Sequence, residues 1–166
     1  MKSPVTDICD LNRELPPDAP YAPQWLVDAL QVPREEGWVN SDGCDVHYFR
    51  WGDPANPPLL LMHGFLAHAR CMAFIAPFLA EQYHVVAYDL SGMGDSGVRS
   101  SYPDAVRAQE VVDVARETGL FDHAIKPIVI AHSYGGHVGL AAMNNFHELF
   151  GGLVVCDLMV LSLIHI

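Results

Sequence analysis

Short apolar runs recur along the middle of the chain and predict strands that are buried on both faces. The runs are Leu59–Met62, His84–Tyr88, Pro127–Ala131 and Gly152–Cys156. A continuous apolar run of this length is typical of a parallel strand that is covered on both sides, whereas a half-exposed strand alternates apolar and polar residues.

Between these runs, apolar residues return with helical spacing. We expect helices over Ala69–Ala80, from Asp104 as the N-cap to about Thr118, and over Tyr134–Phe150. Because strands and helices alternate, the sequence predicts an α/β fold, a mostly parallel sheet with flanking helices on both faces.

The N-terminal part of the chain has a different pattern. Residues 1–34 are rich in proline and predict an extended arm with one short helix near Trp25–Leu30. Gly37–Asn40 and Asp45–Trp51 predict two strands, and Ser41-Asp42-Gly43 between them is a turn signal, so we expect a hairpin. We therefore expect an arm over 1–34 and a single domain over 35–160.

Composition and charge narrow the function classes. The chain has 166 residues, a hydrophobic share of 51% and a net charge of −11, which argues against a surface for nucleic acid or for an anionic membrane. The N-terminus lacks the apolar segment of a signal peptide, and the apolar stretch from residue 151 to 166 is too short for a membrane span, so we expect a cytoplasmic protein. The four cysteines form no C-x-x-C pair, and we expect free, buried thiols rather than a metal or redox site.

The segment around Ser133 carries the strongest chemical signal. An apolar strand pattern ends at Ala131, Ser133 follows, and Gly135-Gly136 then opens a helical pattern. This is the layout of a nucleophile elbow, in which a sharp turn between a strand and a helix exposes a serine side chain. Small residues must flank the turn, and Ala131 stands where a glycine is usual. A serine hydroxyl becomes an effective nucleophile only when a base takes its proton.

Three loops that each follow a predicted strand resemble the motifs of the α/β-hydrolase family in order and spacing. They are His63-Gly64-Phe65, the loop with Asp89, Gly92, Gly94 and Ser96, and the segment around Ser133. The resemblance covers about residues 36–160 and implies strands 1–6 of the family's eight, the N-terminal part of an α/β-hydrolase domain. A serine at position 133 argues against the epoxide hydrolase and haloalkane dehalogenase branches, which use an aspartate nucleophile.

The resemblance implies a serine esterase or related acyl-transfer hydrolase that acts on a small-molecule acyl substrate. Ser133 would be the nucleophile, and the backbone N–H groups of Phe65 and Tyr134 would form the oxyanion hole. Esters, thioesters, lactones, amides and carbon–carbon bonds remain open as substrates. The resemblance implies no cofactor and no metal, and it leaves the oligomeric state open.

The catalytic acid and base of the family lie in later segments of its fold, so we expect this fragment to be inactive by itself. Asp157 and His165 follow the elbow in the right order, but a separation of eight residues cannot span a strand and a helix; Asp157 alone stays open as the acid. We expect His63 to stiffen its loop, and His132 and His137 to pack locally. The rival interpretation is a non-catalytic receptor or scaffold with a hydrolase fold.

Two further patterns are not expected to contribute to function. Gly92, Gly94 and Gly97 spell the G-x-G-x-x-G of a dinucleotide site, but residues 102–104 separate them from the next helix, so we expect an architectural loop and no cofactor. The last six residues, Leu161–Ile166, match the translation of a sequencing adaptor, and we expect them to be an artefactual tail.

Overall fold

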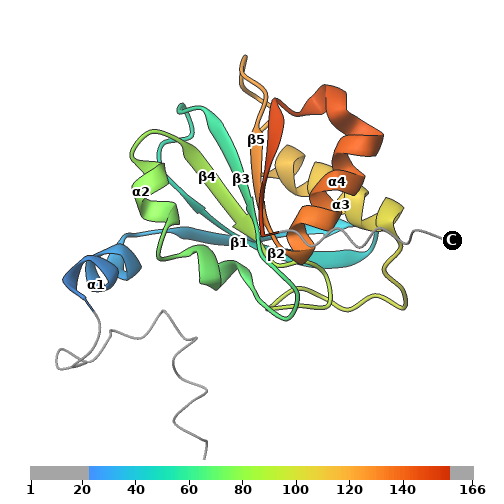
Figure 1. Cartoon of the computed structure of the whole chain (residues 1–166), viewed down its shortest axis with the longest axis horizontal. Coiled ribbons are helices and arrows are strands. Elements are labelled where there is room, and N and C mark those ends of the chain that lie inside the picture. The colour runs from blue at the N-terminus through green and yellow to red at the C-terminus, as the bar shows by residue number, and fades with distance from the viewer. Residues whose placement is uncertain (1–22, 158–166) are drawn as a thin grey trace, which may run out of the picture.

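The computed structural model describes residues 23–157 as one mixed sheet with helices on both faces (Figure 1). The strands are β1 (Glu35–Ser41), β2 (Cys44–Trp51), β3 (Pro58–Met62), β4 (His84–Tyr88), β5 (Ile128–His132) and β6 (Gly152–Cys156). The helices are α1 (Gln24–Gln31), α2 (Ala76–Ala80), α3 (Asp104–Glu117) and α4 (Tyr134–Phe146), with short 3-10 helices η2 (Ala69–Met72) and η3 (His147–Leu149).

The sheet has the strand order β1-β2-β4-β3-β5-β6. The hairpin strands β1 and β2 are antiparallel, and β2 also pairs antiparallel with β4. From β4 onward all pairs are parallel, with Met62 of β3 opposite both Tyr88 and Ala131. The carboxyl ends of the parallel strands therefore meet at one edge of the sheet, where ligands bind in open α/β sheets.

Successive side chains of the central strands pack on opposite faces of the sheet, as the period of a strand requires. Leu60 and Met62 lie in the core under α3 and α4, whereas Leu59 and Leu61 lie in the core under η2 and α2. Every residue of β3 and of β4 is buried, which explains their continuous apolar sequence. Figure 1 shows α1 and α2 on one side of the sheet and α3 and α4 on the other.

The predicted helices are present, with three differences. The single helix expected over Ala69–Ala80 is two pieces, η2 and α2, because Pro77 sits at the start of α2 and lacks the N–H that a continuous helix would need. Pro103, not Asp104, is the N-cap of α3, and Asp104 lies in the first turn, where its charge favours the helix dipole. The last predicted helix ends at Phe146 and continues as η3.

The hairpin and the short N-terminal helix follow the sequence prediction. Asp42 and Gly43 both have positive φ, 46° and 75°, as a tight two-residue turn between antiparallel strands requires. Most of the proline-rich arm and the segment 161–166, with His165, lie outside the described residues. Among the described cysteines, Cys44 is buried but Cys71 and Cys156 are exposed, and all three are free, so the expectation of buried thiols was wrong for two of them.

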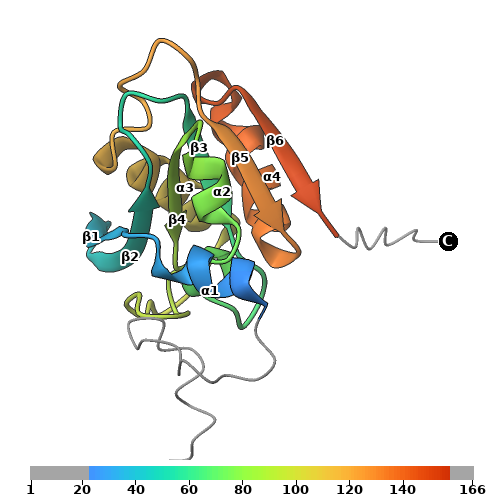
Figure 2. The ribbon, with the colours of Figure 1, turned by 90° about the vertical axis from the view of Figure 1, so that its left-hand side faces the viewer.

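Strand β6 forms the outer edge of the sheet as far as the structure describes it (Figure 2). On the α2 side, an apolar groove of about 490 Å³ runs between α2 and β5, with Phe74, Ile75 and Ile130 among its lining residues. Val154 of β6 is half exposed. An open apolar edge of this kind promotes association with other strands.

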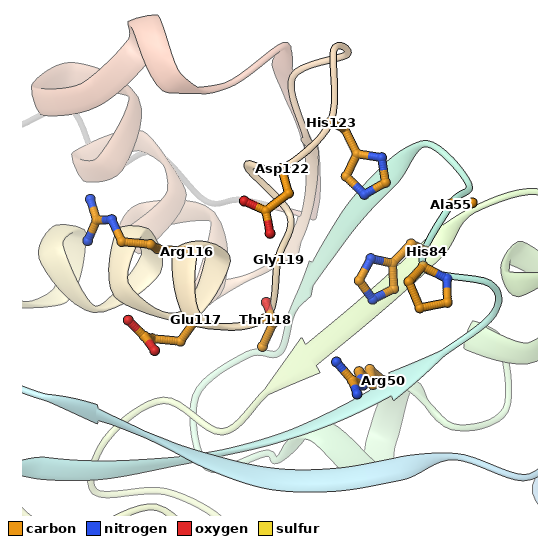
Figure 3. A pocket seen from close by; sticks show the side chains of 10 residues that line it. Arg50, Ala55, His84, Arg116, Glu117, Thr118, Gly119, Asp122 and His123 are labelled. Atoms are coloured by element: carbon orange, nitrogen blue, oxygen red, sulfur yellow. The ribbon is translucent and has the colours of Figure 1, made fainter.

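A second cavity, of about 560 Å³, opens at the other end of the sheet, where β3 and β4 begin. His84, the first residue of β4, forms part of its wall, and the turn after α3 covers it (Figure 3). Across residues 23–157, none of the helices has the length and apolar character needed to cross a membrane.

Candidate active site

Ser133 occupies a strained position between β5 and α4. Its backbone has φ 49° and ψ −116°, a conformation that residues with a Cβ atom rarely adopt. Two main-chain hydrogen bonds hold it: the Ser133 N–H donates to the Cys156 carbonyl of β6 (2.9 Å), and the Gly136 N–H donates to the Ser133 carbonyl (2.8 Å). The strand, sharp turn and helix expected around this serine are all present.

The elbow touches the end of β3 so closely that two positions require glycine. A Cβ atom on Gly135 would lie 2.5 Å from the His63 carbonyl oxygen. A Cβ atom on Gly64 would lie 2.9 Å from Nδ1 of His132 and 3.2 Å from Cβ of Ser133. The loop after β3 and the serine turn are therefore in direct contact, although they are far apart in the sequence.

Phe65 and Tyr134, the two residues expected to supply oxyanion donors, also lie together. Their rings meet edge to face, with centroids 5.8 Å apart. Tyr134 is the first residue of α4, so its N–H has no partner within the helix and lies at the positive end of the helix dipole. Within residues 23–157, no hydrogen bond engages the Phe65 N–H. The arrangement offers backbone donors and a helix N-terminus to a developing negative charge.

His63 is a structural residue of this site. Its ring is buried, Nδ1 lies 2.7 Å from the Gly64 carbonyl, and Nε2 accepts a hydrogen bond from the Leu90 N–H at 3.0 Å. Burial lowers the pKa of His63, so the ring is neutral, with the proton on Nδ1. Since both nitrogens are occupied, His63 joins the loop after β3 to the loop after β4, in agreement with the stiffening role expected from the sequence.

The Asp89 carboxylate organises the loop after β4. It is fully buried, lies 2.8 Å from Nδ1 of His47, and accepts hydrogen bonds from the N–H groups of Ala69 and Asp95. Burial alone would raise the pKa of Asp89, but these hydrogen bonds outweigh it and lower the pKa below its ordinary value. Asp89 is thus held as an anion that ties three segments together.

The glycines of the G-x-G-x-x-G pattern pack against this chain's own residues. A Cβ on Gly94 would overlap the Asp89 carboxylate at 2.2–2.5 Å, and one on Gly92 would overlap the Tyr102 hydroxyl at 2.3 Å. A Cβ on Gly97 would lie 3.1 Å from Sγ of Cys44. Residues of this chain therefore occupy the space beside each of these glycines, which supports the architectural interpretation of the loop.

Comparison with known proteins identifies the family to which this fold and these loops belong. The model of the Alpha/beta hydrolase family matches residues 59–164, from β3 onward. The chain belongs to this family.

The names of the curated relatives of this chain fall into different activity classes. The chain is 29% identical over 109 residues to a human serine hydrolase-like protein, covering 64% of this chain and 52% of that protein. It is 25% identical over 122 residues to epoxide hydrolase 3 of Xenopus tropicalis, covering 72% of this chain and 32% of the relative. The chain thus spans about half the length, or less, of these relatives.

Solved structures show the same fold. The crystal structure of a membrane phospholipase A, described as a bacterial virulence factor, superposes with a TM-score of 0.69 and 32% identity. The match covers 76% of this chain and 40% of the other chain. The mixed, mostly parallel sheet with flanking helices is therefore that of an α/β hydrolase.

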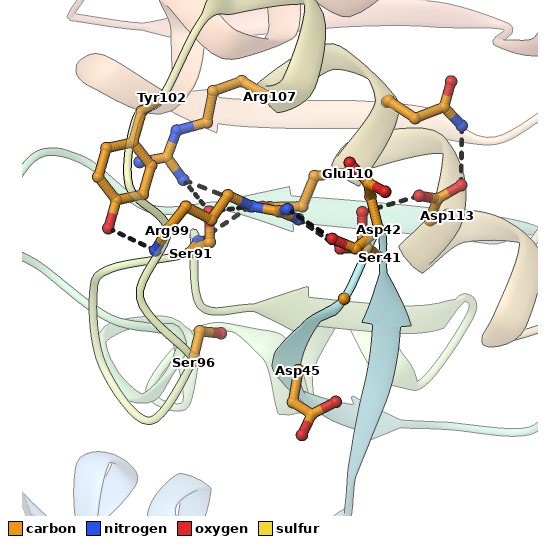
Figure 4. A network of polar contacts seen from close by, with 12 residues as sticks. Ser41, Asp42, Asp45, Ser91, Ser96, Arg99, Tyr102, Arg107, Glu110 and Asp113 are labelled. Carbon is orange, nitrogen blue, oxygen red and sulfur yellow. Dashed lines mark hydrogen bonds and ion pairs between the residues drawn. The ribbon is translucent and has the colours of Figure 1, made fainter.

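A buried ionic network connects the loop after β4 with α3 and was not expected from the sequence (Figure 4). Glu110 of α3 is completely buried and accepts hydrogen bonds from the Ser91 N–H (2.9 Å) and from the guanidinium groups of Arg99 and Arg107 (3.3–3.4 Å). Arg99 also donates to the Ser41 carbonyl at 2.7 Å. The network joins the loop after β4, helix α3 and the hairpin, and breaking one partner would leave a buried charge unpaired.

His47 is a second residue that sequence reasoning missed. Its fully buried ring lies between Asp89 and Glu36, 2.8 Å from each carboxylate. Burial would lower the pKa of His47, but the two carboxylates outweigh it and raise the pKa. Glu36, His47 and Asp95 come close enough to hold a metal ion, yet both nitrogens of His47 are already engaged by carboxylates and Asp95 pairs with Arg70. This cluster therefore joins β1, β2 and the loop after β4 by hydrogen bonds.

The remaining candidate residues are separate from the serine hydroxyl. His132 and His137 are exposed neighbours of the elbow, and Asp157, also exposed, follows β6 with φ 57°. In the part of the chain from residue 23 to 157, no histidine or carboxylate forms a hydrogen bond with the Ser133 side chain. The structure therefore brings together Ser133, Phe65 and Tyr134 but not a base.

Proposed function

We propose that the complete protein is a serine hydrolase that cleaves a carboxylic ester or a related acyl bond. The observation that carries the proposal is the position of Ser133: a strained turn at the start of α4, in contact with the loop that carries Phe65. Serine nucleophiles of acyl-transfer enzymes are presented on such turns, beside backbone donors.

The expected reaction has two halves. The Ser133 hydroxyl loses its proton to a base as its oxygen attacks the acyl carbon, and the N–H groups of Phe65 and Tyr134 stabilise the resulting oxyanion. The alcohol or other leaving group departs with a proton, and a water molecule then cleaves the acyl-enzyme in the same way. We place the base outside residues 23–157, and its acidic partner either outside that range or at Asp157.

The choice of an acyl substrate rests on the chemistry of residue 133. Epoxide hydrolases are among the relatives, but a covalent epoxide-opening mechanism of that branch uses a carboxylate, and a serine hydroxyl stands here instead. The rim of the turn is apolar, because Phe65 and Leu66 are strongly exposed beside Tyr134. We therefore propose a small acyl substrate with an apolar portion, no cofactor, and a cytoplasmic location.

A second candidate function is a non-catalytic receptor or scaffold with the same fold. It is favoured because, within the described part of the chain, no histidine or carboxylate is hydrogen-bonded to the Ser133 side chain. On either hypothesis, the 166-residue chain should show no ester turnover above that of its Ser133→Ala variant, since no described histidine or carboxylate is hydrogen-bonded to the serine hydroxyl.

A fluorophosphonate probe distinguishes the two functions in the complete protein. A serine hydrolase should be labelled stoichiometrically, Ser133→Ala should lose the label, and Ser101→Ala, which changes an exposed serine of the loop before α3, should keep it. Labelling that persists in Ser133→Ala would place the nucleophile elsewhere. A complete lack of labelling, with the fold intact by circular dichroism, would favour the receptor.

A further inference from the structure

The cavity at the amino ends of β3 and β4 contains a buried imidazole without partners. His84 is only 2% exposed, and neither Nδ1 nor Nε2 has a hydrogen-bond partner within residues 23–157. Buried polar atoms are nearly always satisfied, so an unpaired pair of ring nitrogens in a cavity wall indicates that a ligand or solvent belongs there. The cavity lies at the opposite end of the sheet from Ser133.

A second histidine faces the first. His123 stands on the turn between α3 and β5, its ring points toward that of His84 (Figure 3), and the ring centroids are 6.0 Å apart. A metal ion bonded to two imidazole nitrogens at about 2.1 Å each places the ring centroids about 5–6.5 Å apart. The observed spacing lies within this range.

Charges of both signs line the cavity. Of its two arginines, Arg50 is paired with Glu35 and Arg116 with Asp113. The carboxylates of Glu117 and Asp122 line the same cavity without an ion pair in the described structure. The carbonyl end of α3 also points here, since Thr118 and Gly119 form part of the wall, and helix C-termini attract positive charge.

We propose that His84 and His123 bind a divalent transition-metal ion such as Zn²⁺, Co²⁺ or Ni²⁺, with the remaining coordination positions open to water. Two imidazole ligands select such ions over Mg²⁺ and Ca²⁺, which prefer oxygen. The proposal is independent of the chemistry at Ser133, because the two sites lie at opposite ends of the sheet.

Titration of the 166-residue chain with Zn²⁺ by calorimetry, and with Co²⁺ by visible absorption, tests the site. His123→Asn is the informative variant, because His123 lies on a surface turn and its replacement leaves the strands intact. We expect one saturable site in the unaltered chain and at least a tenfold weaker affinity in His123→Asn. His147→Asn is the matched control, since the His147 side chain is 81% exposed and remote from the cavity, and it should bind as the unaltered chain does.

Three results would overturn the proposal. One is Zn²⁺ affinity that is equal in His123→Asn and in the unaltered chain. Another is equal loss of affinity in His123→Asn and His147→Asn, which would indicate general surface binding. The third is saturable binding of inorganic phosphate instead of Zn²⁺, weakened by Arg50→Gln, which would make the cavity an anion site. Ring-proton NMR signals of His84 that shift on addition of Zn²⁺ would support the site even if His84→Asn fails to fold.

Discussion

Replacing Ser133 with glycine should make the protein more stable than replacing it with alanine. Both substitutions remove the hydroxyl, but only alanine keeps a Cβ atom at φ 49° and ψ −116°. Glycine adopts this mirror image of the β region freely, whereas a residue with a Cβ is strained there by about 1–3 kcal/mol. In the opposite direction, glycine has more conformational entropy than alanine in the unfolded chain, which lowers the free energy of unfolding by about 0.5–1 kcal/mol.

The difference between the two terms gives a free energy of unfolding about 1 kcal/mol higher for Ser133→Gly than for Ser133→Ala. For a chain of this length, that corresponds to a rise in Tm of about 2–4 °C. The two hydrogen bonds that hold residue 133 come from its main chain, to Cys156 and Gly136, so both variants retain them. The comparison therefore isolates the backbone strain.

Thermal unfolding followed by circular dichroism, on both variants in one buffer, measures the difference. The matched control is the pair Ser101→Gly and Ser101→Ala, at an exposed position without a positive φ, where glycine should be the less stable variant. If Ser133→Gly melts at the same temperature as Ser133→Ala or below it, the elbow is not strained and the argument from its geometry is wrong.

Two further predictions concern the supports of the elbow. Gly135→Ala should lower the free energy of unfolding by about 2–3 kcal/mol in urea titrations, because its Cβ would meet the His63 carbonyl oxygen at 2.5 Å. The control is Gly43→Ala, at positive φ but with nothing within 4 Å, which should lower the free energy of unfolding by only about 1–2 kcal/mol. Equal losses in the two variants would contradict the packing argument. The lowered pKa of Asp89 means that the unfolded state takes up a proton more readily, so its contribution to stability should be present above the ordinary carboxylate pKa and be lost as the pH falls below about 4. The raised pKa of His47 has the opposite effect, because its contribution to stability is lost as the pH rises above about 6.5. Urea unfolding from pH 3 to 9 should show a loss of stability at both ends of the range, and Asp89→Asn should reduce the loss at acid pH.

The sequence predicted the central strands well because their burial admits little choice. Residues of β3 and β4 are covered on both faces, so their side chains are mostly apolar, with His84 as the exception, and the runs were visible directly. The break between η2 and α2 was missed because the helical spacing of Met72, Ile75 and Leu79 continues across it, although Pro77 offered a local signal. The antiparallel pairing of β2 with β4 has no local signature.

The proximity of Phe65 and Ser133 in the candidate site could be predicted from the order of the strands. The loops that bear Phe65 and Ser133 follow neighbouring strands, and parallel strands bring their carboxyl ends together. The partners of Asp89 and Glu110 could not be predicted, because they lie far away in the sequence: His47 is 42 positions from Asp89, and Ser91 is 19 positions from Glu110. A glutamate within a helix is ordinarily exposed, so its complete burial could be found only in three dimensions.

The hydrogen bond from the Ser133 N–H to the Cys156 carbonyl also sets an order of events during synthesis. The acceptor is translated 23 residues after the donor, a delay of about 1–5 s at usual elongation rates. Until β6 has left the ribosome and paired with β5, the main chain at Ser133 lacks the bond that holds its unusual dihedral angles. The nascent chain can therefore complete its central sheet while the serine turn still lacks this hydrogen bond, and the hydrogen-bonded turn at Ser133 is completed last among the elements described here.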